Sequence, residues 1–233
     1  APSPATGSSI QWAEGYVEPG LAAIGQLGCE PLYAYAAATV SGSFTVGPDI
    51  YQDEGGTYAA VEKAYGGLLY APGDGHALHL TAGRQPYTLG DGFLVHHVRG
   101  STNVGDRRGL YLGARNAHDL AALFTWKRPG FALRAFYLDP DELEELESNT
   151  TFLGANAAWD LGRGRSIDAT CLTIPRSDTV FRVPAGEGVD REGLTTLAAH
   201  ARYGCAFGVP GALLEGQVAT QTGHGGRVAA WAG

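Results

Sequence analysis

The sequence predicts an all-β protein, an antiparallel transmembrane β-barrel or part of one built from long amphipathic strands. Three observations predict it: long runs of alternating apolar and polar residues, 35 glycines without a single methionine, and the lack of any long apolar run. Glycine costs roughly 1 kcal/mol relative to alanine inside a helix, so this composition favours strands and turns. A spanning helix needs about 20 apolar residues, which leaves a closed barrel as the way to cross a membrane.

The clearest strand is expected at residues 32–46. Its even positions are apolar or small, from Leu32 to Val46, while its odd positions are aromatic, small or hydroxylated, as at Thr39 and Ser43. Period-2 alternation places these two sets on opposite faces. The run is longer than the average strand of about 5–6 residues and long enough for a tilted membrane strand, which needs about 9–11.

The same alternation predicts nine further strands and no helix, so we expect ten to twelve strands in total. They are residues 58–71, 77–89, 118–127, 131–138, 152–161, 166–174, 194–205, 212–222 and 227 to the end. Two strands break the pattern: Glu62 and Lys63 fall on opposite faces, and Arg84 shares a parity with Leu78 and Leu80. A bulge or an interfacial position is expected at both places.

The connections are of two kinds. Short turn signals stand at residues 72–75, 128–130 and 162–164, whereas residues 99–108 and 176–193 form longer polar stretches. Short turns on one side and long loops on the other are typical of outer-membrane barrels.

The length favours a single domain over residues 1–233. The chain begins without a methionine or an apolar signal core, as a mature secreted chain would, and its abrupt ending suggests a barrel that is incomplete at the C-terminus. Cys29, Cys171 and Cys205 show no metal-ligand spacing; one pair of them can close a disulfide, but we expect them to be small apolar bystanders.

Residues 80–94 contain Gly83-Arg84-Gln85 followed by Gly90-Asp91-Gly92, and here the chain resembles the alginate-export family of outer-membrane porins. Residues 132–142 and 32–49 resemble that family's strand with an acidic loop and its early strand. The resemblance implies a porin of the bacterial outer membrane that passes an anionic polysaccharide such as alginate or another small solute. It also implies contact with outer-membrane lipid and lipopolysaccharide, and export partners in the periplasm.

The charge distribution is the main functional signal. From Arg84 to Arg134 there are eight basic and three acidic residues, a local excess of five positive charges in a chain of net charge −8. Arginine matches carboxylates, so inward basic side chains predict an electropositive path for anions. The expected pore-lining residues are Arg84, Arg115, Lys127, Arg134, His200 and Arg202. The alternative for several others, above all Arg107 and Arg108, is a loop position or contact with lipopolysaccharide phosphates.

The remaining polar clusters predict no chemistry. The acidic residues at 139–147 match no calcium loop and are expected to be a solvated loop. His96 and His97 are neighbours on a strand and point to opposite faces, so they cannot jointly bind a metal. No nucleophile, phosphate-binding, dinucleotide or zinc motif is present, and no basic helix or aromatic stripe suggests nucleic acid. We therefore expect no enzyme activity, cofactor or metal.

Two rivals stay open. One is a soluble β-sandwich that binds carbohydrate or hydrolyses it with a carboxylate pair assembled by folding, because sugar-binding aromatics and acids give a similar pattern. The other is a barrel that serves only as an adhesin or scaffold.

Overall fold

The computed structural model describes residues 11–28, 30–48, 54–96, 112, 115–142, 147–181, 189–204, 209, 212–223 and 226–232; within these, the side chains of residues 181, 189 and 226–232 are not described. The described residues contain strands and no helix. No helix among them is long and apolar enough to cross a membrane. The strands are β1 (Ala13–Val17), β2 (Gly20–Gln26), β3 (Leu32–Val46), β4 (Gly56–Gly73), β5 (His76–Gln85), β6 (His118–Arg128), β7 (Phe131–Asp139), β8 (Thr151–Gly162), β9 (Arg165–Arg176), β10 (Val180–Phe181), β11 (Val189–Asp190), β12 (Thr195–Gly204), β13 (Leu213–Gly223) and β14 (Gly226–Ala232).

Twelve of these strands form one sheet. Its order is β1-β3-β4-β5-β6-β7-β8-β9-β12-β13-β14 with β2 beside β3, and β10 and β11 pair separately. The all-β, antiparallel fold class is thereby confirmed. The described residues contain fourteen strands, two more than the ten to twelve expected, because β10 and β11 form a sheet of their own. Within the described residues no ladder joins β14 to β1 or β2, so the sheet is not closed there.

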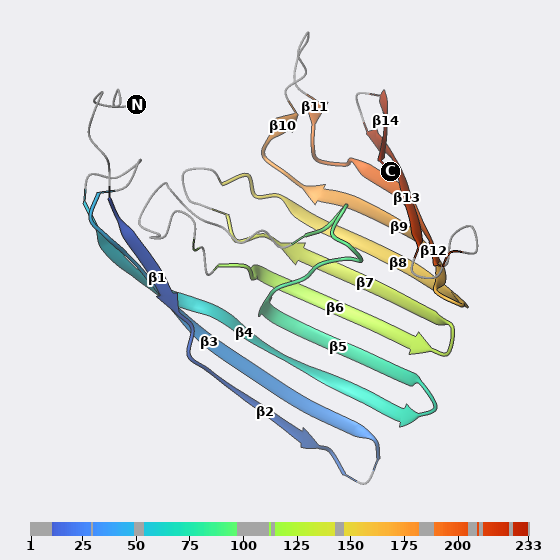
Figure 1. Cartoon of the computed structure of the whole chain (residues 1–233), viewed down its shortest axis with the longest axis horizontal. Helices are drawn as coiled ribbons and strands as arrows, with labels where there is room; N and C mark the ends of the chain where they lie inside the picture. Colours follow the sequence, from blue (N-terminus) through green and yellow to red (C-terminus); the bar gives the residue numbers. More distant parts are fainter. Residues whose placement is uncertain are drawn as a thin grey trace. The chain divides into compact units, whose positions relative to one another are not determined.

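The chain divides into two compact units. The first comprises residues 1–22, 37–64 and 85–117, and the second comprises residues 23–36, 65–84 and 118–233. In the first unit β1 pairs with the C-terminal part of β3, from Ala13↔Val46 to Val17↔Gly42. In the second unit strands β5 to β9 run side by side, and β12 to β14 continue the sheet edge-on to the viewer (Figure 1).

All ten strands expected from alternation are present, and β3 has the expected bounds. The strand predicted at residues 77–89 is wrong at its C-terminal end, because β5 stops at Gln85. Pro86 follows it and has no N–H to donate to a ladder. The sequence pattern missed β1 and β2: Gly20–Gln26 reads Gly-Leu-Ala-Ala-Ile-Gly-Gln and does not alternate.

The two faces of the sheet in the second unit differ: one exposes large apolar side chains, and the other buries polar side chains together with Phe136 and Leu138. One row of opposed residues crosses β6 to β13 as Phe124, Ala135, Ala155, Cys171, Leu197 and Thr220. The next row, on the other face, reads Thr125, Arg134, Asn156, Thr170, Ala198 and Ala219. Leu197 is 53% exposed, whereas Asn156 and Thr170 are only 3% and 5% exposed. This is the reverse of a water-soluble sheet, whose polar face is the solvated one.

A large side chain covers Gly154 on the polar face. Phe136 lies opposite Gly154 and is 1% exposed. A Cβ on Gly154 would come within 2.3 Å of the Phe136 ring. Because the ring occupies this space, the sheet is densely packed at this point.

Turn geometry explains the short connections. Asp74 and Gly75 have φ of 51° and 77°, and Arg163 and Gly164 have φ of 56° and 72°. Two successive positive φ values define the type I′ turn, whose twist matches that of a hairpin. Up to β9 these short turns alternate with longer connections at residues 47–55, 86–117, 140–150 and 177–194, as the sequence predicts.

Both expected irregularities are present. Gly83 has φ of 128°, a conformation that other residues rarely adopt, and it interrupts the alternation just before Arg84. In β4 the exposed side chains change from odd to even numbers between Val61 and Ala64. Each shift is what one additional residue in a strand produces.

Candidate functional site: the polar face

A chain of hydrogen bonds crosses the covered face of the second unit. Arg134 Nη1 donates to Asn156 Oδ1 at 2.9 Å. The Asn156 amide nitrogen donates to Asp168 Oδ1 at 3.0 Å and to Thr170 Oγ1 at 2.9 Å. We call these residues, together with His200 and Glu215, the polar ladder.

His200 continues the polar ladder between two carboxylates. Its Nδ1 lies 2.8 Å from Asp168 Oδ2 and its Nε2 lies 2.8 Å from Glu215 Oε1. Carboxylate oxygens accept, so the ring makes both bonds only when both nitrogens carry protons. When both nitrogens carry protons, His200 bridges the two acids and ties β9 to β13 across β12.

Strand register explains why these residues meet. Arg134 lies directly opposite Asn156, Asn156 opposite Thr170, and Asp168 opposite His200. Directly opposed side chains on one face have Cβ atoms about 5 Å apart, which suits a hydrogen bond between side chains. Hydroxyl, amide and charged groups therefore pair across five strands.

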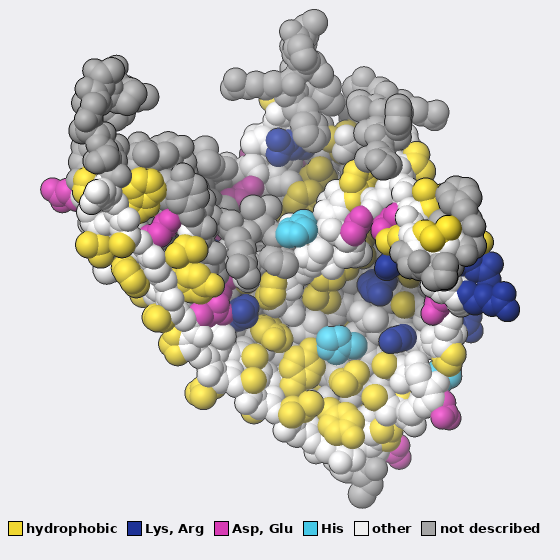
Figure 2. All heavy atoms as spheres, viewed as in Figure 1, with side chains coloured by type: hydrophobic (Ala, Val, Ile, Leu, Met, Phe, Trp, Pro, Cys, Tyr) yellow, Lys and Arg dark blue, Asp and Glu magenta, His cyan; other side chains and the backbone are white. Residues whose placement is uncertain are grey.

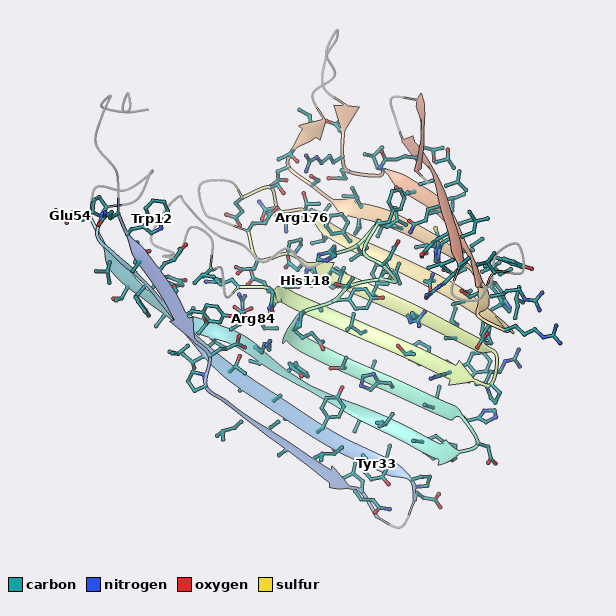
Figure 3. All side chains as sticks on the ribbon, in the orientation of Figure 1. Trp12, Tyr33, Glu54, Arg84, His118 and Arg176 are labelled. Atoms are coloured by element: carbon teal, nitrogen blue, oxygen red, sulfur yellow. The ribbon has the colours of Figure 1, made fainter. Side chains whose placement is uncertain are left out.

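Arg84 occupies a different place, at the end of β5 (Figure 3). Its Nη2 donates to Asp141 Oδ2 at 2.8 Å, and its Nη1 forms an ion pair with Asp119. Its side chain is 14% exposed. The two carboxylates balance its charge, so the electrostatic pull of Arg84 on a passing anion is weakened.

Arg115 belongs to the first unit. Its guanidinium donates to the Tyr58 hydroxyl at 2.8 Å and stands 5.6 Å from the centroid of the Tyr58 ring. Nearby in sequence, the fully buried Glu62 accepts bonds from the backbone nitrogens of Asn116 and Ala117 at 2.6 and 2.9 Å. These contacts attach residues 115–117 to β4.

Lys127 and Arg202 are exposed and lie near strand ends. Lys127 faces Ala132, and Arg202 lies opposite Ser166 and Glu215. Of the six residues that the sequence singled out, the structure joins Arg134 and His200 through the polar ladder. Arg84, Lys127 and Arg202 lie elsewhere in the second unit, and Arg115 lies in the first.

The sequence did not single out the acceptors of the polar ladder. Asp168 shares its parity with Ser166 and Thr170, so alternation alone identifies it as polar-facing. Its partners depend on the register with β8 and β12, which no local pattern encodes. The polar ladder therefore contains two acidic side chains, Asp168 and Glu215, beside Arg134 and His200.

The described residues of the acidic stretch at 139–147 include two that bind neighbouring side chains or backbone groups. Asp141 pairs with Arg84, and Glu142 accepts bonds from the Ser148 backbone nitrogen at 2.7 Å and from the Ser148 hydroxyl; residues 143–146 lie outside the described part. The described residues hold no cluster of three His, Cys, Asp or Glu side chains placed for a metal. Cys171 has a free, exposed thiol, while Cys29, Cys205 and His97 are outside the described residues.

The apolar face carries an aromatic cluster beside the short turns. Trp126, Phe131 and Trp159 lie two, zero and three residues from the turn-side ends of β6, β7 and β8. Phe131 stands between the two indoles, with ring centroids 5.8 Å and 5.4 Å away. The Arg128 guanidinium lies 5.5 Å from the Trp126 ring. Both tryptophans are near strand ends on the apolar face, as parity predicts.

The chain matches no family model, no curated protein and no solved structure. The resemblance to alginate-export porins therefore rests on residues 32–49, 80–94 and 132–142 alone.

Proposed function

We propose that this chain forms the wall of a transmembrane β-barrel in the bacterial outer membrane and that its polar face lines a passage for hydrophilic solutes. The observation that carries the proposal is the burial pattern of strands β6 to β13: leucines, valines and aromatic rings are exposed on one face, while asparagine and threonine are buried on the other beside Phe136 and Leu138. In this reading the chain catalyses no reaction.

Lipid accounts for the exposed face. Burying a leucine or phenylalanine side chain is worth about 1.5–3 kcal/mol, so a face that keeps many of them in water is unfavourable. Hydrocarbon supplies the missing apolar surroundings. Strands β6, β7, β8, β9, β12 and β13 have 11, 9, 12, 12, 10 and 11 residues, which fits the roughly 9–11 residues that a tilted strand needs to cross a bilayer.

Closure requires further pairing. A spanning sheet leaves no edge open in hydrocarbon, so β14 and the β1–β2 side both need partners. Neighbouring strands are antiparallel, and β14 is the eleventh strand in the order that begins with β1, so β14 and β1 run in the same direction. An all-antiparallel barrel has an even number of strands, so closing this one requires an odd number of additional strands.

The sandwich alternative lacks support in the described residues. A sandwich buries its apolar face against a second sheet. The second sheet described here is the two-stranded pair β10–β11, which is too small to cover six long strands.

An anionic saccharide remains the proposed solute, with Arg134 and Arg202 as its contacts. Among the described residues neither forms an ion pair, whereas Arg84 is held by two aspartates. A fixed positive charge in a narrow passage attracts anions, and salt screens it over about 8–10 Å.

Two measurements test the proposal. The protein should stay with outer membranes after a carbonate wash, and in planar bilayers it should conduct with anion preference that fades at high salt. Arg134→Gln with Arg202→Gln should lower that preference, while Arg128→Gln, at an exposed arginine beside the aromatic cluster, serves as the control. Release by carbonate would refute the membrane wall, and an inserted but non-conducting protein would favour the scaffold. Cation selectivity of the unaltered protein would refute the anionic solute.

A further inference from the structure

The apolar face of the second unit contains a groove over β12. Small residues form its middle, namely Ala169, Ala199, Ala201 and Gly216, and its volume is about 580 Å³. Trp159 and Ile167 bound it on the side of β8 and β9, and Val218 bounds it on β13. Along β12, Leu197 and Tyr203 lie on the same face on either side of Ala199 and Ala201 and carry larger side chains.

A ligand in this groove gains no backbone hydrogen bonds from the sheet. Strand β9 pairs with β8 and β12, β12 pairs with β9 and β13, and β13 pairs with β12 and β14. Every strand beneath the groove therefore has both edges occupied. A peptide would bring N–H and C=O groups that stay unsatisfied on such a face, at a substantial energetic cost in hydrocarbon. A hydrocarbon chain has no such groups.

Basic side chains follow the groove residue Ile167 towards the β8–β9 turn. Arg165 precedes Ile167 by two residues, so both point to the same face, and Arg165 lies opposite Tyr203. Arg165 Nε donates to the Gly162 carbonyl at 3.3 Å, which holds the guanidinium near the β8–β9 turn. Arg163 is exposed in that turn, and Figure 2 shows basic side chains gathered there.

We propose that this groove binds one anionic phospholipid of the surrounding bilayer, with an acyl chain over Ala199, Ala201 and Gly216 and the phosphate at Arg165 and Arg163. This inference rests on the proposed function, because it requires the apolar face to lie in lipid. Arginine forms charge-assisted hydrogen bonds with phosphate oxygens, and Trp159 and Tyr203 are amphipathic rings suited to the depth of the headgroups.

Trp159 provides the signal for a test. A protein with Trp12, Trp126 and Trp231 replaced by phenylalanine retains one indole, at the wall of the groove. It is placed in equimolar phosphatidylglycerol and phosphatidylcholine vesicles, with brominated acyl chains on one lipid or on the other. Bromine quenches a neighbouring indole, so we expect stronger quenching when the anionic lipid carries it.

Two variants with matched controls locate the effect. Gly216→Leu fills the groove, and no atom lies within 4 Å of where its Cβ would stand, so the strand tolerates it. Gly25→Leu is the control, an exposed strand glycine with equally open surroundings. Arg165→Gln removes the cation; Arg176→Gln, at the opposite end of β9, is its control.

Gly216→Leu should weaken quenching by the anionic lipid, and Arg165→Gln should lower the preference for it by up to about fivefold, since one basic residue near an anionic surface contributes on the order of 1 kcal/mol. Both controls should behave as the parent. Equal quenching by the two vesicle sets in the parent, or no effect of Gly216→Leu, would overturn the lipid site while leaving the barrel intact. Absence of quenching from both vesicle sets would refute the membrane position of this face, and the lipid site with it.

Discussion

The strongest prediction compares an arginine at two depths on one strand. Phe124 and Leu120 are both on the apolar face of β6, 37% and 42% exposed. Leu120 is two residues from the start of the strand, whereas Phe124 is near its middle. Four residues correspond to about 13 Å along a strand, and a tilt of about 40° reduces this to roughly 10 Å of depth.

The magnitude follows from that depth. An arginine facing lipid costs about 2–4 kcal/mol at the midplane and about 0–1 kcal/mol near the interface. We therefore expect Phe124→Arg to lower the free energy of unfolding by about 2–4 kcal/mol and Leu120→Arg by about 1 kcal/mol or less. Leu153 is placed like Leu120, because each is the third residue of its strand.

Urea unfolding in lipid vesicles measures both values. Phe124→Leu is the control, because an apolar exchange on a lipid-facing surface should cost less than about 1.5 kcal/mol. If the face were in water, surface substitutions would change stability by only about 0.5 kcal/mol at either position. Equal costs for the two arginines would refute the depth argument and the lipid-facing assignment.

Three further substitutions test the polar face and the strand geometry. Asn156→Ala should destabilise the protein by about 1–3 kcal/mol in urea unfolding, because Arg134 and Thr170 each lose a buried partner; a change below the measurement error would show that the polar ladder is not formed. Gly83→Ala should cost about 1–3 kcal/mol, since alanine is strained at φ of 128°, and an unchanged unfolding midpoint would contradict the bulge. Gly154→Ala should cost about 1–3 kcal/mol through the clash with Phe136, and tolerance of the added methyl would mean that the ring is not held over the glycine.

The sequence by itself determined the strands and their two faces. Alternation is a local property: each residue's face follows from the count along its own strand, so β3 was predicted with its exact bounds. The turns were equally readable, because positive φ selects glycine and a few polar residues, as at Asp74. Even the irregularity at Arg84 was visible as a break in parity. Strands β1 and β2 were not predicted, because their residues do not alternate between apolar and polar.

Only the tertiary structure decided which residues meet. The pairing of Arg134 with Asn156 and of His200 with Asp168 depends on the register between strands, and a shift of one residue would send every side chain to the other face. The ion pairs of Arg84 join residues 35 and 57 positions apart along the chain. No local sequence pattern encodes these pairings, because the hydrogen bonds between strands are made by backbone groups common to all residues. For the same reason the excess of basic residues in the sequence did not reveal that Arg84 is held by the carboxylates of Asp119 and Asp141.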